Sequence, residues 1–104
     1  MSSEQTIENE IVSKGLTAPR LTPASIDAAI KAECYWVAPD TTLTICVLIL
    51  QNGFTVTGES ACASPENFDE DLGRKIARDN AREKIWPLEG YLLRQRLHDA
   101  KGER

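Results

Sequence analysis

Three arginines recur at every fourth position in the C-terminal third of the sequence, where their guanidinium groups could bind phosphate. Arg74, Arg78 and Arg82 share one side of any helix they form, because side chains four residues apart are neighbours on a helix. Planar guanidinium groups suit bidentate contact with phosphate oxygens. Nearby acids allow a second interpretation, in which the row is a solvated helix face with ordinary i,i+4 ion pairs. These acids are Glu70, Asp71, Asp79 and Glu83.

Aromatic side chains are few, so the position of each one matters. Phe54 directly follows a predicted tight turn, where its ring could fill the core or stack on a nucleotide base. Tyr35 and Trp36 point to opposite faces of a predicted strand, so one should face the core and the other the rim. Trp86 precedes Pro87 and should anchor packing at a helix kink.

The sequence does not contain the patterns of a self-contained enzyme. Ser60 has no histidine placed to activate it, because His98 is the one histidine and lies near the C-terminus. Neither a GxGxxG nor a P-loop pattern is present, and the three cysteines lack the spacing of a zinc site. We therefore expect a binding protein that is not an enzyme and that uses no metal and no cofactor.

Length and charge narrow the classes of partner. The 104 residues suit one domain with one core, and a hydrophobic fraction of 41% is ordinary for a globular protein. A net charge of -4 disfavours duplex nucleic acid and anionic membranes, because neutralising phosphates requires a surplus of Lys and Arg. The sequence shows neither the pattern of a signal peptide nor a membrane-spanning run. These features predict a cytoplasmic protein.

The elements that would position these residues follow from periodicity and capping. Residues 1–15 form a predicted helical arm, which Gly15 would end. A second helix should begin at Thr22, whose hydroxyl can cap free amides, and continue for about three turns to Glu33. The next residues, 34–37, are rich in strand formers and predict a short strand.

The strongest local pattern is a β-hairpin. Residues 42–51 are rich in β-branched residues and leucine, residues 54–62 form the return strand, and Asn52-Gly53 lies between them. The Asn-Gly pair favours a two-residue type I′ turn, because that turn needs positive φ at both positions. The sequence therefore predicts a tight hairpin within an antiparallel sheet.

A two-residue turn would fix the register of this hairpin by pairing Val47 with Gly58. The predicted core face then holds Leu43, Ile45, Val47, Ile49, Phe54 and Val56. The opposite face is apolar on the longer strand through Leu48 and Leu50, and polar on its partner. Either a helix or a second copy of the chain should cover that face.

A long C-terminal helix is predicted from the acidic residues 69–71 onward, with a kink near Pro87. Its predicted apolar stripe is Leu72, Ile76, Ala81 and Ile85, continued by Leu88 and Leu92. The fold class is therefore α+β: an antiparallel sheet of about three strands, packed by N-terminal helices and a long kinked helix. We expect a single domain over residues 1–104, with an arm at 1–15, a core at 22–97 and a frayed tail at 98–104.

Longer stretches of the sequence resemble a family of small tailed-phage proteins. These stretches read KGLTAPRLTP, TTLTICVLILQNGFTVTGESACASPENFD and GRKIARDNAREKIWPLEGYLL, and the resemblance runs from Gly15 to Leu97. The family is similar to the one that includes the first-described Thoeris anti-defence protein. That resemblance implies a sponge that sequesters cyclic ADP-ribose variants made by TIR-domain enzymes, with cyclic oligonucleotides as further ligands, and that does not cleave them.

The resemblance also implies a homo-oligomer, a dimer or an assembly of dimers, in the host cytoplasm. Its pocket would combine Phe54 on the base with Arg78 and Arg82 on the diphosphate, with Arg74 and Asn80 as further candidates. The loop at residues 64–67 would close over the ligand. An alternative function is a phage protein-interaction module that docks on a host protein through the face with Leu48 and Leu50 or through the helical tail.

Overall fold

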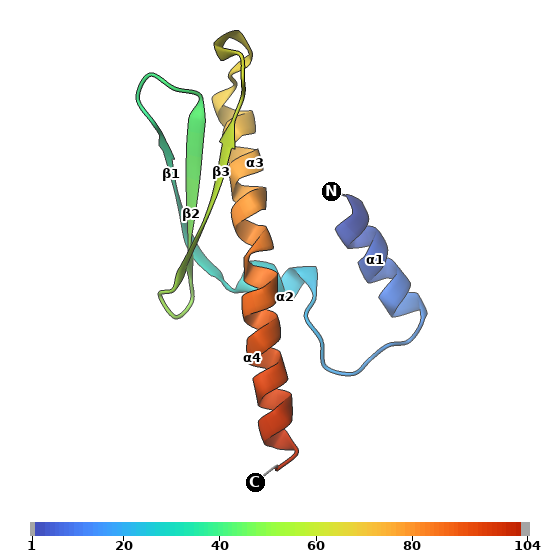
Figure 1. Cartoon of the computed structure of the whole chain (residues 1–104). Helices are drawn as coiled ribbons and strands as arrows, with labels where there is room; N and C mark the ends of the chain where they lie inside the picture. Colours follow the sequence, from blue (N-terminus) through green and yellow to red (C-terminus); the bar gives the residue numbers. More distant parts are fainter. Residues whose placement is uncertain (1, 103–104) are drawn as a thin grey trace.

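The computed structural model describes residues 2–102 and shows an α+β fold, which confirms the predicted class. One antiparallel sheet has the strand order β1-β2-β3, and a long helix lies across one of its faces (Figure 1). The elements are α1 (Ser2–Ser13), α2 (Pro23–Ala28), β1 (Ile30–Val37), β2 (Leu43–Leu50), β3 (Thr55–Ala61), a 3-10 turn η1 (Pro65–Asn67), α3 (Glu70–Glu83) and α4 (Ile85–Ala100).

The hairpin between β2 and β3 forms where predicted, but its loop has three residues rather than two. The Gly53 amide donates to the Leu50 carbonyl at 2.9 Å, and the Leu50 amide donates to the Phe54 carbonyl at 2.8 Å. Gly53 has a φ of 91°, whereas Asn52 is not among the described residues with positive φ. Its side chain instead accepts from the Phe54 amide. The turn is therefore a three-residue loop that Gly53 closes.

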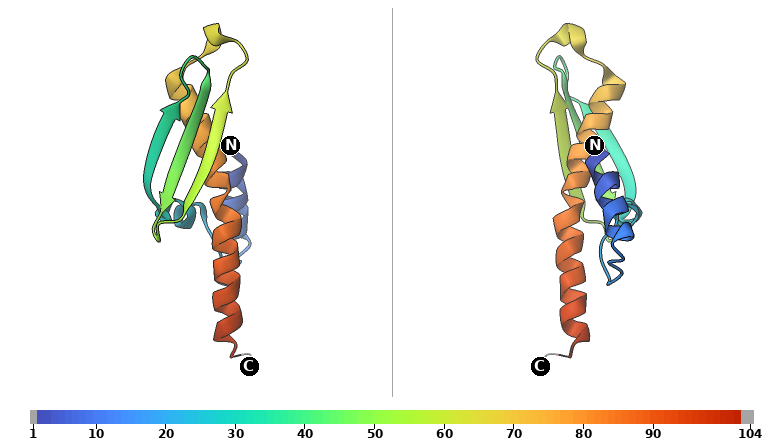
Figure 2. Two further views of the ribbon diagram at one scale, coloured as in Figure 1. Left: turned by 60° about the vertical axis from the view of Figure 1, so that its left-hand side comes forward. Right: turned by 90° about the vertical axis from the view of Figure 1, so that its right-hand side faces the viewer.

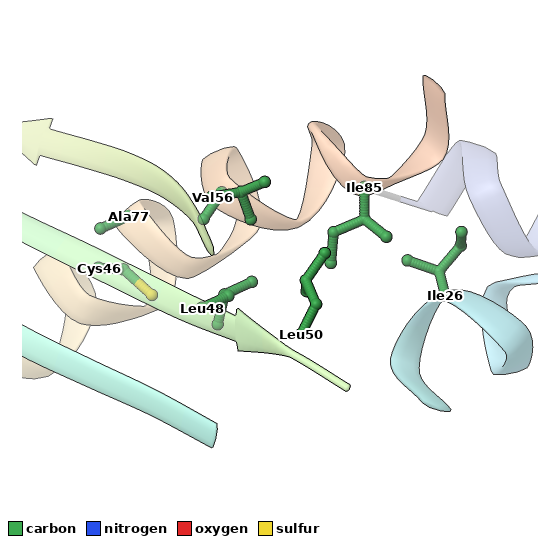
Figure 3. Packing of buried hydrophobic residues seen from close by; sticks show 8 residues of the cluster. Ile26, Cys46, Leu48, Leu50, Val56, Ala77 and Ile85 are labelled. Carbon is green, nitrogen blue, oxygen red and sulfur yellow. The ribbon is translucent and has the colours of Figure 1, made fainter. Parts of the chain in front are cut away.

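This longer loop shifts the strand register by one residue and reverses the predicted core face of β2. Gly58 pairs with Cys46 and not with Val47. Because strand side chains alternate, a shift of one residue exchanges the two faces of a strand. The buried β2 residues are Thr44, Cys46, Leu48 and Leu50, joined by Val56 of β3 (Figure 3). The predicted core face was wrong for β2, whose Leu48 and Leu50 belong to the core. It was also wrong for Phe54, which is 56% exposed, whereas Val56 is buried as predicted.

Helix α3 packs on this face through its smallest side chains. Gly73, Ala77 and Ala81 are buried, and Ile85 continues the buried stripe into α4. A Cβ atom on Gly58 would lie 2.2 Å from the Ala81 amide nitrogen, so the helix backbone nearly touches the strand.

The predicted helix stripe was partly wrong for the same reason. Ala81 and Ile85 are buried as expected, but Leu72 is 53% exposed and Ile76 is 44% exposed. Only small residues fit between two backbones in such close contact, and the larger side chains turn away from the sheet.

The boundary between the second helix and the first strand lies earlier in the sequence than predicted. Thr22 caps α2 as expected, since its hydroxyl accepts from the Ser25 amide at 3.0 Å. The helix ends at Ala28, and β1 begins at Ile30 by pairing with Leu50. Hydrogen bonds to β2 thus recruit residues 30–33 into the sheet, although their local pattern was helical.

The long C-terminal helix bends by 24°, in agreement with the predicted kink. Lys84 joins α3 to α4, and Pro87 occupies the third position of α4, where a missing amide hydrogen costs little. Helix α4 continues to Ala100 and projects beyond the sheet (Figure 2), while residues 103–104 of the expected tail lie outside the described residues. The radius of gyration is accordingly 17.1 Å, compared with about 13 Å for a compact domain of this length.

Helix α1 forms the expected N-terminal arm, and Gly15 follows its end with a φ of 69°. It lies beside the junction of α3 and α4 and does not contact the sheet (Figures 1 and 2). No helix in the described part of the chain combines the length and hydropathy needed to cross a bilayer.

Candidate functional site

Two of the predicted phosphate-binding arginines meet at the β1 edge of the sheet. Since α3 places its small residues on the sheet, its arginine row emerges along the flank beside β1. The Nε atom of Arg78 lies 3.3 Å from a carboxylate oxygen of Glu33 on β1. The guanidinium carbon of Arg74 lies 5.6 Å from the ring centroid of Tyr35. The Arg74 side chain is 48% exposed and the Arg78 side chain is 32% exposed, so both remain accessible to solvent.

Glu33 and Tyr35 complete this cluster, and their protonation states are fixed by their contacts. The Tyr35 hydroxyl donates a hydrogen bond to Glu33. That bond, followed by the contact with Arg78, lowers the pKa of Glu33 below its usual value. Desolvation and the same carboxylate raise the pKa of Tyr35. At neutral pH the edge therefore presents a neutral phenol ring, one carboxylate and two guanidinium groups. We call Glu33, Tyr35, Arg74 and Arg78 the edge cluster.

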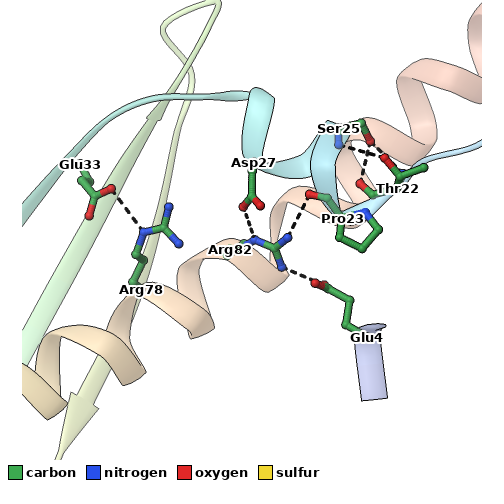
Figure 4. A network of polar contacts seen from close by, with 8 residues as sticks. All are labelled: Glu4, Thr22, Pro23, Ser25, Asp27, Glu33, Arg78 and Arg82. Carbon is green, nitrogen blue, oxygen red and sulfur yellow. Dashed lines mark hydrogen bonds and ion pairs between the residues drawn. The ribbon is translucent and has the colours of Figure 1, made fainter. Parts of the chain in front are cut away.

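Arg82 is engaged in structural contacts instead. Its Nε donates to Asp27 at 2.8 Å, one terminal nitrogen to Glu4 at 2.8 Å, and the other to the Pro23 carbonyl at 3.1 Å (Figure 4). Its side chain is 12% exposed. Desolvation opposes its charge, but the hydrogen bonds that it donates to Glu4 and Asp27 outweigh that effect and raise the pKa of Arg82. Arg82 thus ties α1, α2 and α3 together.

The remaining two candidates, Asn80 and Phe54, lie elsewhere. The Asn80 amide donates to the Glu59 carbonyl at 2.9 Å, which places it on the β3 side of α3. Phe54 is 56% exposed at the hairpin tip, beside a cavity of 200 Å³ whose other lining residues are Leu50, Asn52, Leu88 and Leu92. Within one chain, the structure brings Arg74 and Arg78 together but does not add Phe54 to them.

Tyr35 and Glu33 were absent from the predicted site, although the sequence carried a signal for one of them. Strand alternation requires Tyr35 and Trp36 to face opposite sides, and this expectation is confirmed: Tyr35 is half-buried beside α3, and Trp36 is 56% exposed on the other face. Glu33 carried no such signal, because the predicted helix placed it outside the sheet. Its role appears only when β1 pairs with β2 from Ile30 onward.

The face of the sheet opposite α3 is open, and no described helix covers it (Figure 2). Val47 lies near its centre, on the central strand β2, and Trp36 lies toward the end of the edge strand β1. The full open face consists of Ala32, Cys34 and Trp36 of β1, Leu43, Ile45, Val47 and Ile49 of β2, and Thr55, Thr57, Glu59 and Ala61 of β3. The predicted docking face with Leu48 and Leu50 was wrong, because both residues are buried in the core between the sheet and the helices. The spare apolar surface is the other side of the same strand.

Comparison with known families supplies one match. The family model described as "Phage protein (N4 Gp49/phage Sf6 gene 66) family" matches residues 21–97. The chain belongs to this phage family. No curated protein and no solved structure matches the chain.

The match to the phage family spans every element that builds the edge cluster. Strands β1 to β3, helix α3 and most of α4 lie within residues 21–97, whereas α1 lies before them. Arg82 therefore joins the matched region to the arm through Glu4.

Other hollows near the predicted residues are less suited to phosphate. A cavity of 300 Å³ beside Asn80 and Arg82 is also lined by Glu4, Asp79 and Glu83, so carboxylates outnumber the one arginine. The loop at residues 64–67 contains η1, and Pro65 lines a hollow of 420 Å³ at the end of the sheet away from the hairpin tip. Within residues 2–102, no group of three His, Cys, Asp or Glu side chains is placed to hold a metal ion.

Proposed function

We propose that this phage protein is an anti-defence sponge that sequesters cyclic nucleotide immune signals in the host cytoplasm and does not cleave them. The ligands would be cyclic ADP-ribose variants made by TIR-domain enzymes, with cyclic oligonucleotides as further candidates. The observation that carries this proposal is the edge cluster, in which Arg74 and Arg78 lie accessible beside the ring of Tyr35. The resemblance of the sequence to phage anti-defence proteins supports the same function.

The chemistry of the edge cluster suits a cyclic nucleotide. Guanidinium groups one helix turn apart can each hold phosphate oxygens of one diphosphate, with bidentate geometry. The Tyr35 ring offers a surface for a base, and the ionised Glu33 can accept hydrogen bonds from ribose hydroxyls. The ion pairs of the two arginines, Arg74 with Glu70 and Arg78 with Glu33, are partly exposed to solvent. Such pairs contribute about 0.2–1 kcal/mol, so a diphosphate can replace them at small cost.

A second copy of the chain is part of the proposal. The open face of the sheet, with Trp36 and Val47, supports a dimer or an assembly of dimers, because an uncovered apolar sheet face is stabilised by burial. Phe54 lines a different hollow of its own chain. The proposed pocket therefore takes the Phe54 ring from a neighbouring copy. Arg82 holds α3 to α1 and α2, and Asn80, on the β3 side of α3, lies outside the pocket.

Thermal denaturation of the purified protein tests the proposal. Cyclic ADP-ribose variants and cyclic dinucleotides are added separately, and a ligand that binds only the native state raises stability by RT ln(1 + [L]/Kd), about 2.7 kcal/mol at one hundred times Kd. Arg78→Ala should abolish the rise in melting temperature. Arg94→Ala removes the same charge from the exposed part of α4 and should keep it. Arg82→Ala is a poor test, because it also breaks the contacts to Glu4 and Asp27.

The same mixture distinguishes sequestration from turnover. Chromatography after heat denaturation of the complex should return the ligand intact and in full yield. A melting temperature that no cyclic nucleotide raises, or a rise that Arg78→Ala leaves unchanged, would contradict the proposed site. A hydrolysed ligand would assign the protein to an enzyme class instead.

The open face also favours a second candidate function, a protein-interaction module that docks on a host protein. Its apolar character suits a protein partner as well as a second copy. The two candidates separate in a pull-down from host lysate. A stoichiometric host protein that Val47→Lys releases and Arg78→Ala retains would favour docking, whereas self-association of the purified chain would favour the sponge.

A further inference from the structure

A cavity of 310 Å³ lies between the N-terminal arm and the body of the protein, apart from the edge cluster. Its walls are apolar. Ile7 and Ile11 of α1 form one side, and Leu21, Pro23 and Trp86 form the other. Its volume corresponds to about ten water molecules at roughly 30 Å³ each, which is the lower end of the range for small-molecule pockets.

The rim of this cavity carries an uncompensated negative charge. Glu8 forms two hydrogen bonds of 2.8 Å with the guanidinium of Arg20, and that contact lowers the pKa of Glu8. Glu4 accepts a single hydrogen bond of 2.8 Å from the guanidinium of Arg82. The third rim carboxylate, Glu83, is exposed and has no ion pair among the described residues. Three carboxylates thus face two arginines, and Glu83 is the one left free.

We propose that this cavity binds a small organic cation with an apolar body. Isoleucine, leucine and proline walls exclude water from such a body. The indole of Trp86, which also lines the cavity, can attract a cation held over its ring. Glu83 supplies the counter-charge at the mouth. The same rim repels phosphates, so the cavity and the edge cluster select ligands of opposite charge. This second site is independent of the proposed nucleotide binding, and either one can fail alone.

Fluorescence of Trp86 provides a direct readout. Trp36→Phe removes the one other indole, which lies on the open face of the sheet away from the cavity. This variant is titrated with 3-phenylpropylammonium and with 3-phenylpropan-1-ol, which have the same size, about ten non-hydrogen atoms, and differ in charge. We expect a saturable change with the ammonium compound, and at least threefold weaker binding of the alcohol. Added salt should reduce that difference.

Two carboxylate substitutions in the Trp36→Phe variant test whether Glu83 causes the preference for the ammonium compound. Glu83→Gln should remove the preference for the ammonium compound, and Glu66→Gln, the same change at an exposed position on η1, should keep it. Ile11→Phe should weaken binding of both compounds by filling the cavity. Circular dichroism confirms that each variant is folded. The inference is overturned if neither compound binds saturably, if both bind equally, or if Glu83→Gln leaves the preference intact.

Discussion

The two faces of the three-stranded sheet are built from the same strands but differ in what they can contact. On the covered face, Gly58 lies under Ala77 and Ala81, and helix and strand backbones nearly touch. On the open face, Val47 and Trp36 present larger side chains to the surroundings. The covered face is completed within one chain, whereas no described helix covers the open face. Small residues thus allow the close approach of α3 at Gly58, whereas Trp36 stays exposed on the other face.

The edge cluster lies at the border between these faces, which explains its accessibility. Helix α3 is narrow compared with the sheet, and it covers β2 and β3 more fully than β1. Arg74 and Arg78 therefore reach over β1 from the flank of the helix toward Tyr35 and Glu33. If helices covered β1 as fully as β2 and β3, these charged groups would be buried at a large desolvation cost.

The largest expected effect comes from enlarging a side chain on the covered face. Gly58→Val places a Cβ within 2.2 Å of the Ala81 nitrogen and 2.3 Å of the Ala77 oxygen, both backbone atoms. We expect a loss of at least about 3 kcal/mol in the free energy of unfolding, because a helix backbone cannot move aside as a side chain can. Urea denaturation followed by circular dichroism measures this loss.

Thr57→Val is the matched control, since it introduces the same side chain one residue earlier on the open face. It should change the free energy of unfolding by less than about 0.5 kcal/mol, as for other surface substitutions. Equal losses for Gly58→Val and Thr57→Val would show that the two faces do not differ in the way described.

A charge on the open face should act on association more than on folding. Val47→Lys places an ammonium group at the centre of that face, where a second copy would have to desolvate it. We expect at least a tenfold weaker self-association constant, equivalent to about 1.4 kcal/mol, with the monomer still folded. Sedimentation velocity over a range of concentrations measures this constant. Gln95→Lys, on the exposed part of α4, should leave it unchanged. A wild-type chain that stays monomeric at high concentration would refute association through this face.

The smallest expected effect is a pH-dependent change in stability from Glu33, which lies in the edge cluster at the border of the two faces. The pKa of Glu33 is lowered by Tyr35 and Arg78 from a usual value of 4.5. Stability from this group is therefore present above pH 4.5 and is lost as the pH falls through the lower, folded-state pKa. Since Glu33 is 41% exposed, we expect Glu33→Gln to cost less than about 1 kcal/mol near neutral pH.

Urea denaturation near neutral pH and at about pH 3 measures this dependence. The wild type should lose more stability on acidification than Glu33→Gln does. Tyr35→Phe should also reduce the acid-dependent loss, because it removes the hydroxyl that donates to Glu33. An unchanged acid-dependent loss in both variants would show that the edge cluster does not hold Glu33 in its ionised form.

The elements that local chemistry controls were predicted well. The capped start of α2 at Thr22, the end of α1 at Gly15, the hairpin at Asn52-Gly53 and the bend near Pro87 all depend on residues close in sequence. The hairpin register, the start of β1 and the buried side of β2 were predicted poorly. Each of these depends on a partner distant in sequence, as when pairing with β2 extends β1 back to Ile30.

The candidate site divides in the same way. Arg74 and Arg78 were identified from their four-residue spacing, which a helix preserves. Their neighbours Glu33 and Tyr35 come from a strand some forty residues earlier, and no local pattern joins the two segments. Arg82 follows the same spacing, yet contacts with Glu4 and Asp27 give it a structural role.

The sequence by itself determined the α+β class, the membership in a phage family and the row of arginines, because each is written in short-range patterns or in long matching stretches. Tertiary structure alone decided which face of the sheet is buried. A hairpin loop one residue longer than the Asn-Gly pair suggested shifted the register, so that β2 buries Cys46 and Leu48 rather than Val47, and close contact between Gly58 and α3 fixed that choice. The physical reason is the two-residue period of a strand, because a shift of one position against β3 turns every side chain of β2 to the opposite face.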